Sequence, residues 1–319
     1  MNESKIINDY LKTLVIHNNG SLNLNDDVFF DKSKKIVVSV DTYIEGSHFI
    51  DFKKPELVMK KIIRSSISDL ICKGVIPKHY FIAGAGNKKS FSESNLKKIL
   101  KSLTQEQKKY DISLGGGDTV FSKKLSFTIT TIGYSKKIIN RNNARLDDDI
   151  YVTGNLGDSF IGLNILKKKI KVKSNLKKYF ENKFFQPSLH LKFAKKMNIF
   201  ANTSIDISDG LVTDLEKLIN NQRLSYRLFI DKVPISNQLK KLILLKKIKK
   251  EFCVSNGDDY QILFTAKPSK TRIILNIAKS LGVKISKIGK ICSPSIKSEI
   301  LDQKGMKIKL KTKGYIHKF

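Results

Sequence analysis

Apolar and polar residues follow two different periods along this chain, and together they predict alternating strands and helices. Residues 36–41 (IVVSVD), 79–86 (HYFIAGAG) and 125–134 (LSFTITTIGY) have the composition or two-residue alternation of strands. Residues 55–74 and 92–110 have helical spacing, and the first of these helices is opened by a proline and closed by a glycine. The first half therefore predicts an α/β arrangement.

The second half repeats this arrangement after a basic, polar connector at 135–149. A strand, a glycine turn and a helix are predicted over 150–166. Further helices are expected around 188–199, 209–219, 235–247 and 270–281, and further strands around 225–230, 260–265 and 284–290. We therefore expect an α/β fold of mixed α+β character, with two α/β domains at 1–138 and 139–319 and a site in the cleft between them.

Several aspartates stand among small residues at the ends of apolar runs: Asp41, Asp69, Asp118, Asp206 and Asp209. Asp69 follows Ile62 by seven residues and shares its helix face, so its carboxylate should point inward. Carboxylates gathered from buried elements are costly unless a cation neutralises them. A divalent metal is the usual cation, and several together typically handle a polyphosphate.

Each segment also has a plainer interpretation. The glycines at 115–118 (GGGD) could form a turn with a capping aspartate, and Asp209 could cap a helix at 210–219, although a cap does not explain Asp206. A lone histidine such as His48 is more often structural. The segment at 84–90 (GAGNKKS) lacks Walker A spacing, and GxGxxG, GxSxG, HExxH and the protein-kinase signatures are absent. An ATP site here needs a less common architecture.

The chain is strongly basic, with 60 Lys plus Arg against 29 Asp plus Glu and a net charge of +31. Only 6 of the 60 basic residues are Arg and 54 are Lys, as in proteins from AT-rich genomes. Nucleic-acid readers favour Arg, so the lysine clusters at 167–174 and 240–250 are interpreted as solvated surface. A nucleic-acid-binding protein is a minor alternative, and no specific nucleic-acid partner is expected.

Nothing in the sequence indicates a membrane or an oxidising compartment. No segment approaches about 18 uninterrupted apolar residues, and the start of the chain lacks the apolar stretch of a signal peptide. Cys72, Cys253 and Cys292 are far apart and predict neither a disulfide framework nor a zinc site. A cytoplasmic protein is expected.

Seven segments occur in the order and spacing of a known family: NDDVFF, VVSVDTYIEGSHF, SDLICKG, LGGGDT, YVTGNLGDSFIGL, SIDISDGL and NGDDYQILFT. They resemble the pattern of thiamine-monophosphate kinases, which reads roughly GDDA, STDTLVEGxHF, SDIAAMG, GGDT, VTGxLGDSAAGL, AIDISDGL and GGEDYELLFT. The ending KGYIHKF at 313–319 is similar to that family's KGYDHF tail. The resemblance runs from about residue 20 to the C-terminus, and the seven motifs together are highly specific.

This resemblance implies the fold shared with aminoimidazole ribonucleotide synthetase. The N-terminal domain would bind ATP and metal and form a homodimer through its strands. The implied reaction is ATP-dependent phosphorylation of thiamine monophosphate to thiamine diphosphate, by direct in-line transfer with several Mg²⁺ ions. Because an anionic acceptor must approach ATP, positioning and charge screening are the main requirements, and no catalytic side chain is expected.

The resemblance also implies roles for individual residues. Metal-binding positions are Asp27, Ser39, Val40 (through its backbone), Asp41, Asp69, Asp118, Asp206 and Asp209. Nucleotide-contacting positions are Gly117, Asp118, Arg141 and Ser208. Substrate-contacting positions are His48, Asp258 and Thr312. Departures from the pattern are Asn25 and Asn256 for glycines, Gln186 for an arginine, Asp258 for a glutamate and Thr312 for an aromatic residue. The metal and ATP positions are thus intact, whereas the pocket for the thiamine base is altered.

The main alternative keeps the fold and changes the chemistry. Aminoimidazole ribonucleotide synthetases and hydrogenase-maturation enzymes use ATP to activate an oxygen, which nitrogen or sulfur then displaces. The DTYIEGSHF segment at 41–49 and the KGYIHKF tail fit the thiamine branch better. The reactive N-terminal cysteine of selenophosphate synthetases is also absent.

Overall fold

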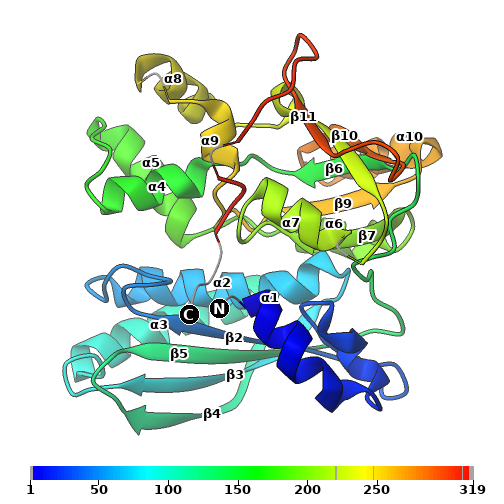
Figure 1. Cartoon of the computed structure of the whole chain (residues 1–319). Coiled ribbons are helices and arrows are strands. Elements are labelled where there is room, and N and C mark those ends of the chain that lie inside the picture. Colours follow the sequence, from blue (N-terminus) through cyan, green and yellow to red (C-terminus); the bar gives the residue numbers. More distant parts are fainter. Residues whose placement is uncertain (1–2, 220, 247, 311, 316–319) are drawn as a thin grey trace.

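A computed structural model of the chain describes residues 3–219, 221–246, 248–310 and 312–315. The described residues form two α/β halves, each built on one sheet. Helix α2 (Pro55–Cys72) lies between the two sheets (Figure 1). This helix therefore has neighbours in both halves.

The first sheet has the strand order β1-β2-β5-β3-β4. Its strands are β1 (Phe29–Asp31), β2 (Ile36–Ile44), β3 (Pro77–Gly86), β4 (Ser113–Phe121) and β5 (Ser126–Tyr134). Only β3 and β4 pair in parallel, and α3 (Glu93–Tyr110) connects them as a βαβ unit. The chain enters this sheet through α1 (Glu3–Ile6) and the short helices η1 (Ile7–Leu11), η2 (Lys12–Val15) and η3 (Asn19–Leu24).

The second sheet has the strand order β11-β8-β10-β6-β9-β7 and is antiparallel except between β8 and β11. Its strands are β6 (Asp149–Thr153), β7 (Ala201–Asp206), β8 (Ser225–Phe229), β9 (Ile262–Ala266), β10 (Ile285–Cys292) and β11 (Glu299–Leu301). The helices of this half are α4 (Asp158–Leu166), α5 (Ser174–Phe185), α6 (Leu191–Met197), α7 (Leu211–Leu218), α8 (Asn237–Lys246), α9 (Lys250–Val254) and α10 (Thr271–Ser280), with short turns η4 (Ile230–Lys232) and η5 (Pro268–Lys270).

The mixed α/β fold with two sheets is confirmed, but the plainer interpretation of one glycine segment is wrong. The glycine segment 115–118, interpreted as a turn, lies inside strand β4. Pairing with β3 holds it extended, and a Cβ at Gly117 would lie 1.9 Å from the Ile82 carbonyl oxygen. Close approach of the two backbones thus explains this glycine. Helix α5 was not predicted.

The core of the first half continues into the second. One buried cluster joins Tyr43 on β2 and Ile63 on α2 to Phe264 on β9. Apolar burial is the main source of stability in such a cluster. The two halves are therefore packed on a shared apolar interface, with α2 at its centre.

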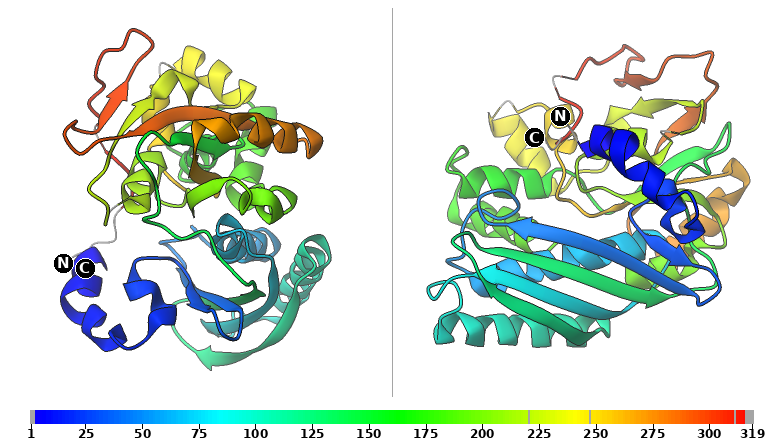
Figure 2. Two further views of the ribbon diagram at one scale, coloured as in Figure 1. Left: turned by 90° about the vertical axis from the view of Figure 1, so that its right-hand side faces the viewer. Right: turned by 60° about the horizontal axis from the view of Figure 1, so that its bottom comes forward.

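The two faces of the first sheet differ. Odd-numbered residues of β2 face α2, whereas Val40 on the other face is 60% exposed. This outer face also exposes Val120 on the edge strand β4, and Figure 2 (right) shows its strands without a covering helix. An open sheet face with apolar side chains is typical of an interaction surface.

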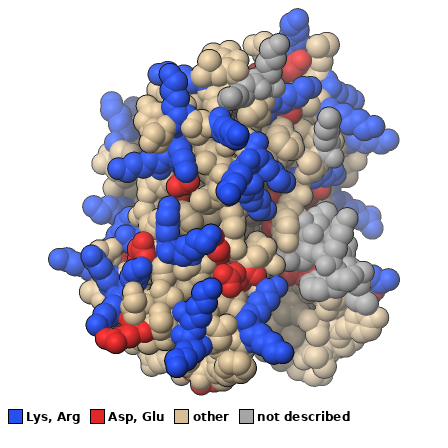
Figure 3. Space-filling model, turned by 90° about the vertical axis from the view of Figure 1, so that its left-hand side faces the viewer, with Lys and Arg blue, Asp and Glu red and all other residues tan. Residues whose placement is uncertain are grey.

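Basic side chains are spread over the molecule. Figure 3 shows Lys and Arg scattered across one face, with acidic side chains among them and uncharged surface between them. No helix among the described residues is long and apolar enough to span a membrane.

Candidate active site

Three aspartates from three different elements meet between α2 and the two sheets. Asp41 lies on the inner face of β2, Asp69 in the last turns of α2, and Asp206 at the end of β7. Burial and the neighbouring Asp206 carboxylate raise the pKa of Asp41 to about 6. Burial, and then the Asp41 and Asp206 carboxylates, raise the pKa of Asp69 well above its usual range. Close, desolvated like charges produce such shifts.

Hydrogen bonds fix two of these carboxylates and leave the third partly unpaired. Ser39 Oγ donates to Asp69 Oδ2, and Tyr43 Oη donates to Asp41 Oδ2 at 3.2 Å. Asp206 is only 3% exposed, and its Oδ2 atom has no hydrogen-bond partner. A buried, unpaired carboxylate oxygen is costly without a cation, and oxygen atoms are the donors that Mg²⁺ prefers. These residues therefore suit Mg²⁺ by donor chemistry.

The described residues do not hold these carboxylates in the arrangement that a bound metal ion requires. Among them, no three His, Cys, Asp or Glu side chains are gathered closely enough to hold a metal ion as they stand. Two basic side chains instead lie near the carboxylates. Burial raises the pKa of Asp206, while the positive charges of Lys73 and Arg141 act in the opposite direction.

Asp26 and Asp27 bring the N-terminal segment to the same place. Arg141 donates from Nη2 to Asp27 Oδ1 and from its backbone N–H to Asp26 Oδ2 at 2.8 Å. The second oxygen of Asp27, Oδ2, is buried without a hydrogen-bond partner and lies 3.7 Å from Lys73 Nζ, too far for a hydrogen bond. Arg141 Nε is also buried and unpartnered. The predicted residues Asp27 and Arg141 thus lie together.

Asp209 does not cap α7, so its capping interpretation is wrong. Asp214 of that helix accepts from the backbone N–H groups of Asp209 and Gly210, at 3.0 Å each. Burial and the Asp209 carboxylate raise the pKa of Asp214 to about 8. The side chain of Asp209 instead pairs with Lys217, with 2.5 Å between Nζ and Oδ2.

Two glycine loops place Ser208 and Asp258 beside each other. Gly210 has a φ of 132°, and a Cβ at Gly257 would lie 1.7 Å from the Ser208 carbonyl oxygen. This close approach allows the Asp258 N–H to donate to Ser208 O at 2.8 Å. The last described residues join them, since Tyr315 N–H donates to Asp209 O at 3.0 Å. Residues 316–319 of the predicted tail lie outside the described part of the chain.

The three predicted substrate residues have different neighbours in the structure. His48 Nδ1 accepts from the Ile44 N–H at 3.0 Å, and its ring lies edge-on to Tyr43. The Asp258 carboxylate lies 2.6 Å from the ammonium of buried Lys61 on α2. Thr312 is exposed. No contact joins these three residues within the described chain, so their shared role stays a prediction.

Asp118 and Gly117 are not brought to the inner aspartates within one chain. Asp118 aligns with Ala83 on β3 and Thr128 on β5, and Thr128 pairs with Thr42 on the exposed face of the sheet at 2.9 Å between hydroxyls. Three strand spacings, roughly 14 Å, separate β4 from β2. Their predicted metal and nucleotide roles stay predictions.

Sequence reasoning missed the basic partners of the site. Lys61 on α2 and Lys73 at the C-terminal cap of that helix are 1% and 0% exposed. Each was one lysine among 54, and no sequence signal distinguishes a buried lysine from a solvated one. Asp26 could have been predicted from the sequence, because it directly precedes the predicted ligand Asp27 in the NDD segment.

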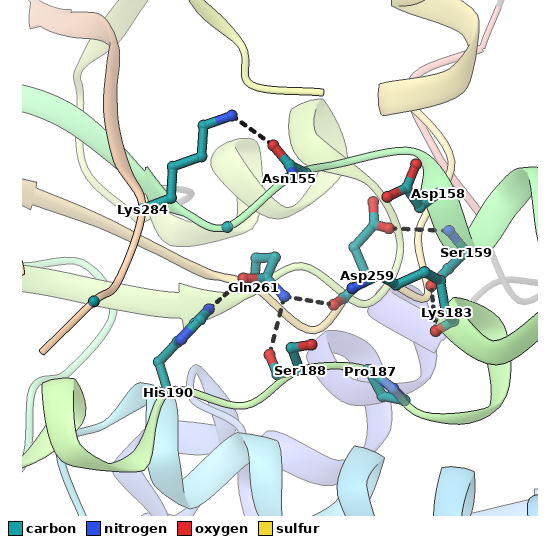
Figure 4. Close-up of a pocket in the computed structure, with 12 residues that line it drawn as sticks. Asn155, Asp158, Ser159, Lys183, Pro187, Ser188, His190, Asp259, Gln261 and Lys284 are labelled. Atoms are coloured by element: carbon teal, nitrogen blue, oxygen red, sulfur yellow. Dashed lines mark hydrogen bonds between the residues drawn. The ribbon is translucent and has the colours of Figure 1, made fainter. Parts of the chain in front are cut away.

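A cavity of about 220 Å³ lies apart from these residues, in the second half (Figure 4). Gln261 Nε2 donates to Ser188 O at 3.0 Å, and Gln261 Oε1 lies 2.9 Å from His190 Nε2. Asp259 accepts from the N–H groups of Gly157 and Ser159. None of the predicted site residues lines this cavity. Gln261 and Asp259 therefore already have hydrogen-bond partners within the protein.

Comparisons with known proteins give a consistent result. Residues 24–135 match the family described as AIR synthase related protein, N-terminal domain. The thiamine-monophosphate kinase of Buchnera aphidicola subsp. Acyrthosiphon pisum is 32% identical over 90% of this chain and 88% of its own length. That of Bacillus subtilis is 28% identical over 99% of both chains. A solved structure described as AaThiL complexed with AMPPCP and TMP is 26% identical, with a TM-score of 0.84 and 99% of both chains covered.

Proposed function

This chain belongs to the thiamine-monophosphate kinase family, and we propose that its inner aspartates are the centre of that family's reaction. The protein phosphorylates thiamine monophosphate with ATP, giving thiamine diphosphate and ADP. The observation that supports this site most strongly is the meeting of Asp41, Asp69 and Asp206 from both halves, with a buried oxygen of Asp206 unpaired. Because the chain belongs to this family, two alternatives from the sequence are set aside. One was another reaction of the same superfamily, and the other was a nucleic-acid-binding protein.

The inner aspartates and Asp27 would hold Mg²⁺, which when bound screens the negative charges of the two substrates. Ser39 donates to Asp69, and the Asp214 carboxyl interacts with the charges of both Asp209 and Asp206, so Ser39 and Asp209 are included in the proposed metal site. Arg141 can turn a donor toward a nucleotide phosphate, because its Nε is unpartnered. The acceptor oxygen of thiamine monophosphate is already ionised, so the chain needs to align the phosphates in line and needs no general base.

We also propose that the chain forms a homodimer through the outer face of the first sheet. The exposed Val40 and Val120 side chains on this face support that proposal, since apolar surface gains most from burial. Such a dimer would explain Asp118. Because it lies on the outer face, Asp118 would serve the site of the second copy, together with Gly117.

The remaining assignments are proposals of the same kind. Residues 1–138 would form the N-terminal domain for ATP, metal and dimerisation, and 139–319 the C-terminal domain. The first sheet ends at Tyr134 and the second begins at Asp149, which supports this division. Ser208 would contact the nucleotide, and Val40 a metal through its backbone. His48, Asp258 and Thr312 would contact the substrate. A cytoplasmic location agrees with three free cysteines.

The reaction is tested by incubating the protein with Mg²⁺, ATP and thiamine monophosphate and identifying the products by mass. We expect ADP and thiamine diphosphate in equal amounts, and neither in EDTA. ADP release that ignores thiamine monophosphate, or a phosphorylated product other than thiamine diphosphate, would contradict the proposed function.

The dimer is tested by mixing two inactive variants, Asp69→Asn and Asp118→Asn. If Asp118 acts on the partner's site, each mixed dimer has one intact site. An equal, fully exchanged mixture then recovers about a quarter of wild-type activity. No recovery from fully exchanged dimers would remove Asp118 from the partner's site.

A further inference from the structure

Lys73 is a buried cation inside the proposed metal site, and nothing in the sequence predicted a role for it. It is 0% exposed and lies at the C-terminal cap of α2. Its Nζ atom lies 2.7 Å from Asp26 Oδ1 and donates to the Ser204 carbonyl oxygen at 2.8 Å. One ammonium therefore joins the N-terminal segment, α2 and strand β7.

The charges around this ammonium are almost all negative. Asp27 Oδ2 lies 3.7 Å away, and the charges of Asp69 and Asp206 also interact with Lys73. Arg141 is the other cation of this group, and it pairs with the opposite oxygen of Asp27. Burial alone would lower the pKa of Lys73, but the surrounding acidic groups, Asp26 foremost and then Asp206, together outweigh burial and raise it. The amine is therefore charged at neutral pH.

We propose that the Lys73 ammonium is a resident cation of the site, so that its Asp26–Asp27 end holds one divalent ion fewer than its carboxylates could hold without this charge, while Asp27 still serves the ions shared with the inner aspartates. A metal bound to Asp27 Oδ2 would lie within roughly 6 Å of Nζ, given an Mg–O distance of about 2.1 Å. Two cations at that separation repel strongly in a desolvated site.

Lys61 shows how this role differs from that of an ordinary buried lysine. It lies on α2, whose C-terminal end Lys73 caps, and it pairs across the same interface, but with Asp258, which is not among the proposed metal ligands. Its ammonium also lies 4.0 Å from the centre of the Phe184 ring. Replacing Lys61 should weaken the interface, and no metal ion should be able to substitute for it.

The test compares Lys73→Met with Lys61→Met, using Mn²⁺ alone as the probe. Met keeps the length of the side chain and removes only the charge. The measurements are the thermal midpoint in EDTA and in Mn²⁺, and the number of Mn²⁺ ions bound per chain by electron paramagnetic resonance. Lys73 has this role only if the carboxylates bind metal as proposed above, but neither measurement requires thiamine monophosphate or turnover.

Lys73→Met is expected to be destabilised in EDTA and to regain stability in Mn²⁺. It should also bind one more Mn²⁺ ion than the wild type, and this additional ion should bind about tenfold more tightly than the weakest ion of the wild type. Lys61→Met should be destabilised equally in both conditions, with the wild-type number of ions. Unchanged Mn²⁺ binding by Lys73→Met, or destabilisation that Mn²⁺ does not relieve, overturns the proposal. If the variant is insoluble, refolding is compared instead. Recovery only with Mn²⁺ supports the resident cation, and equal failure with Mn²⁺ and with EDTA contradicts it.

Discussion

The inner and outer faces of the first sheet carry aspartates in different surroundings. On the inner face, Asp41 is packed against α2 beside Asp69 and Asp206, and desolvation raises the pKa of all three. On the outer face, Asp118 is exposed and bonded only to the next backbone N–H among the described contacts. The sequence context of the two groups is alike, since both follow apolar or small residues. Their position relative to α2 decides which carboxylates form one electrostatic unit in a single chain.

The largest effect is expected from removing one charge on the inner face. Asp69→Asn keeps the side-chain shape and should lower kcat/KM for thiamine monophosphate by about a thousandfold, because it removes stabilisation of the transferring phosphoryl group. Asp111→Asn is the matched control, since Asp111 is exposed with a φ of 55°, which Asn tolerates. Equal losses in the two variants would place the reaction elsewhere.

A charge on the outer face should separate the subunits without touching the inner carboxylates. Val40→Lys places an ammonium in the proposed dimer surface and is expected to raise the dimer dissociation constant about a hundredfold, which light scattering measures. Leu100→Lys on α3, 66% exposed, provides the control. A Val40→Lys protein of unchanged mass would show that this face is not the dimer interface.

A smaller effect follows from pH in the metal-free protein. The folded-state pKa values of Asp41 and Asp214 are raised to about 6 and about 8, so both acids bind protons more tightly folded than unfolded. Their contribution to stability is complete below the ordinary carboxyl range and is lost as pH rises through these values. In EDTA the melting temperature should fall by a few degrees across this window, and Mg²⁺ should reduce the fall near pH 6, where Asp41 ionises. A melting temperature that rises there would contradict the assigned burial.

Much of the fold follows from local patterns in the sequence. The alternation in β2 and β5 and the spacing of α2 predicted those elements, and the position of Asp69 seven residues after Ile62 correctly placed it toward the interior. Strand β4 was missed because three consecutive glycines are typical of turns. Their extended state comes from pairing with β3, which residues outside the segment determine.

The site was only partly predictable for the same reason. Aspartates among small residues are distinctive in a basic chain, so Asp41, Asp69 and Asp206 could be singled out. Lys73 could not, because its importance depends on burial against Asp26 and Ser204, which are far from it in sequence. The face occupied by Asp118 depends on strand register, and this too is set by long-range pairing.

The most direct test of the central claim is an anomalous difference map from crystals grown with Mn²⁺, AMPPCP and thiamine monophosphate. We expect Mn²⁺ peaks among Asp41, Asp69 and Asp206, with the terminal phosphate of AMPPCP and the phosphate of thiamine monophosphate on either side. Mn²⁺ and nucleotide bound instead at the cavity lined by His190 and Gln261, with no peak at the inner aspartates, would contradict the account.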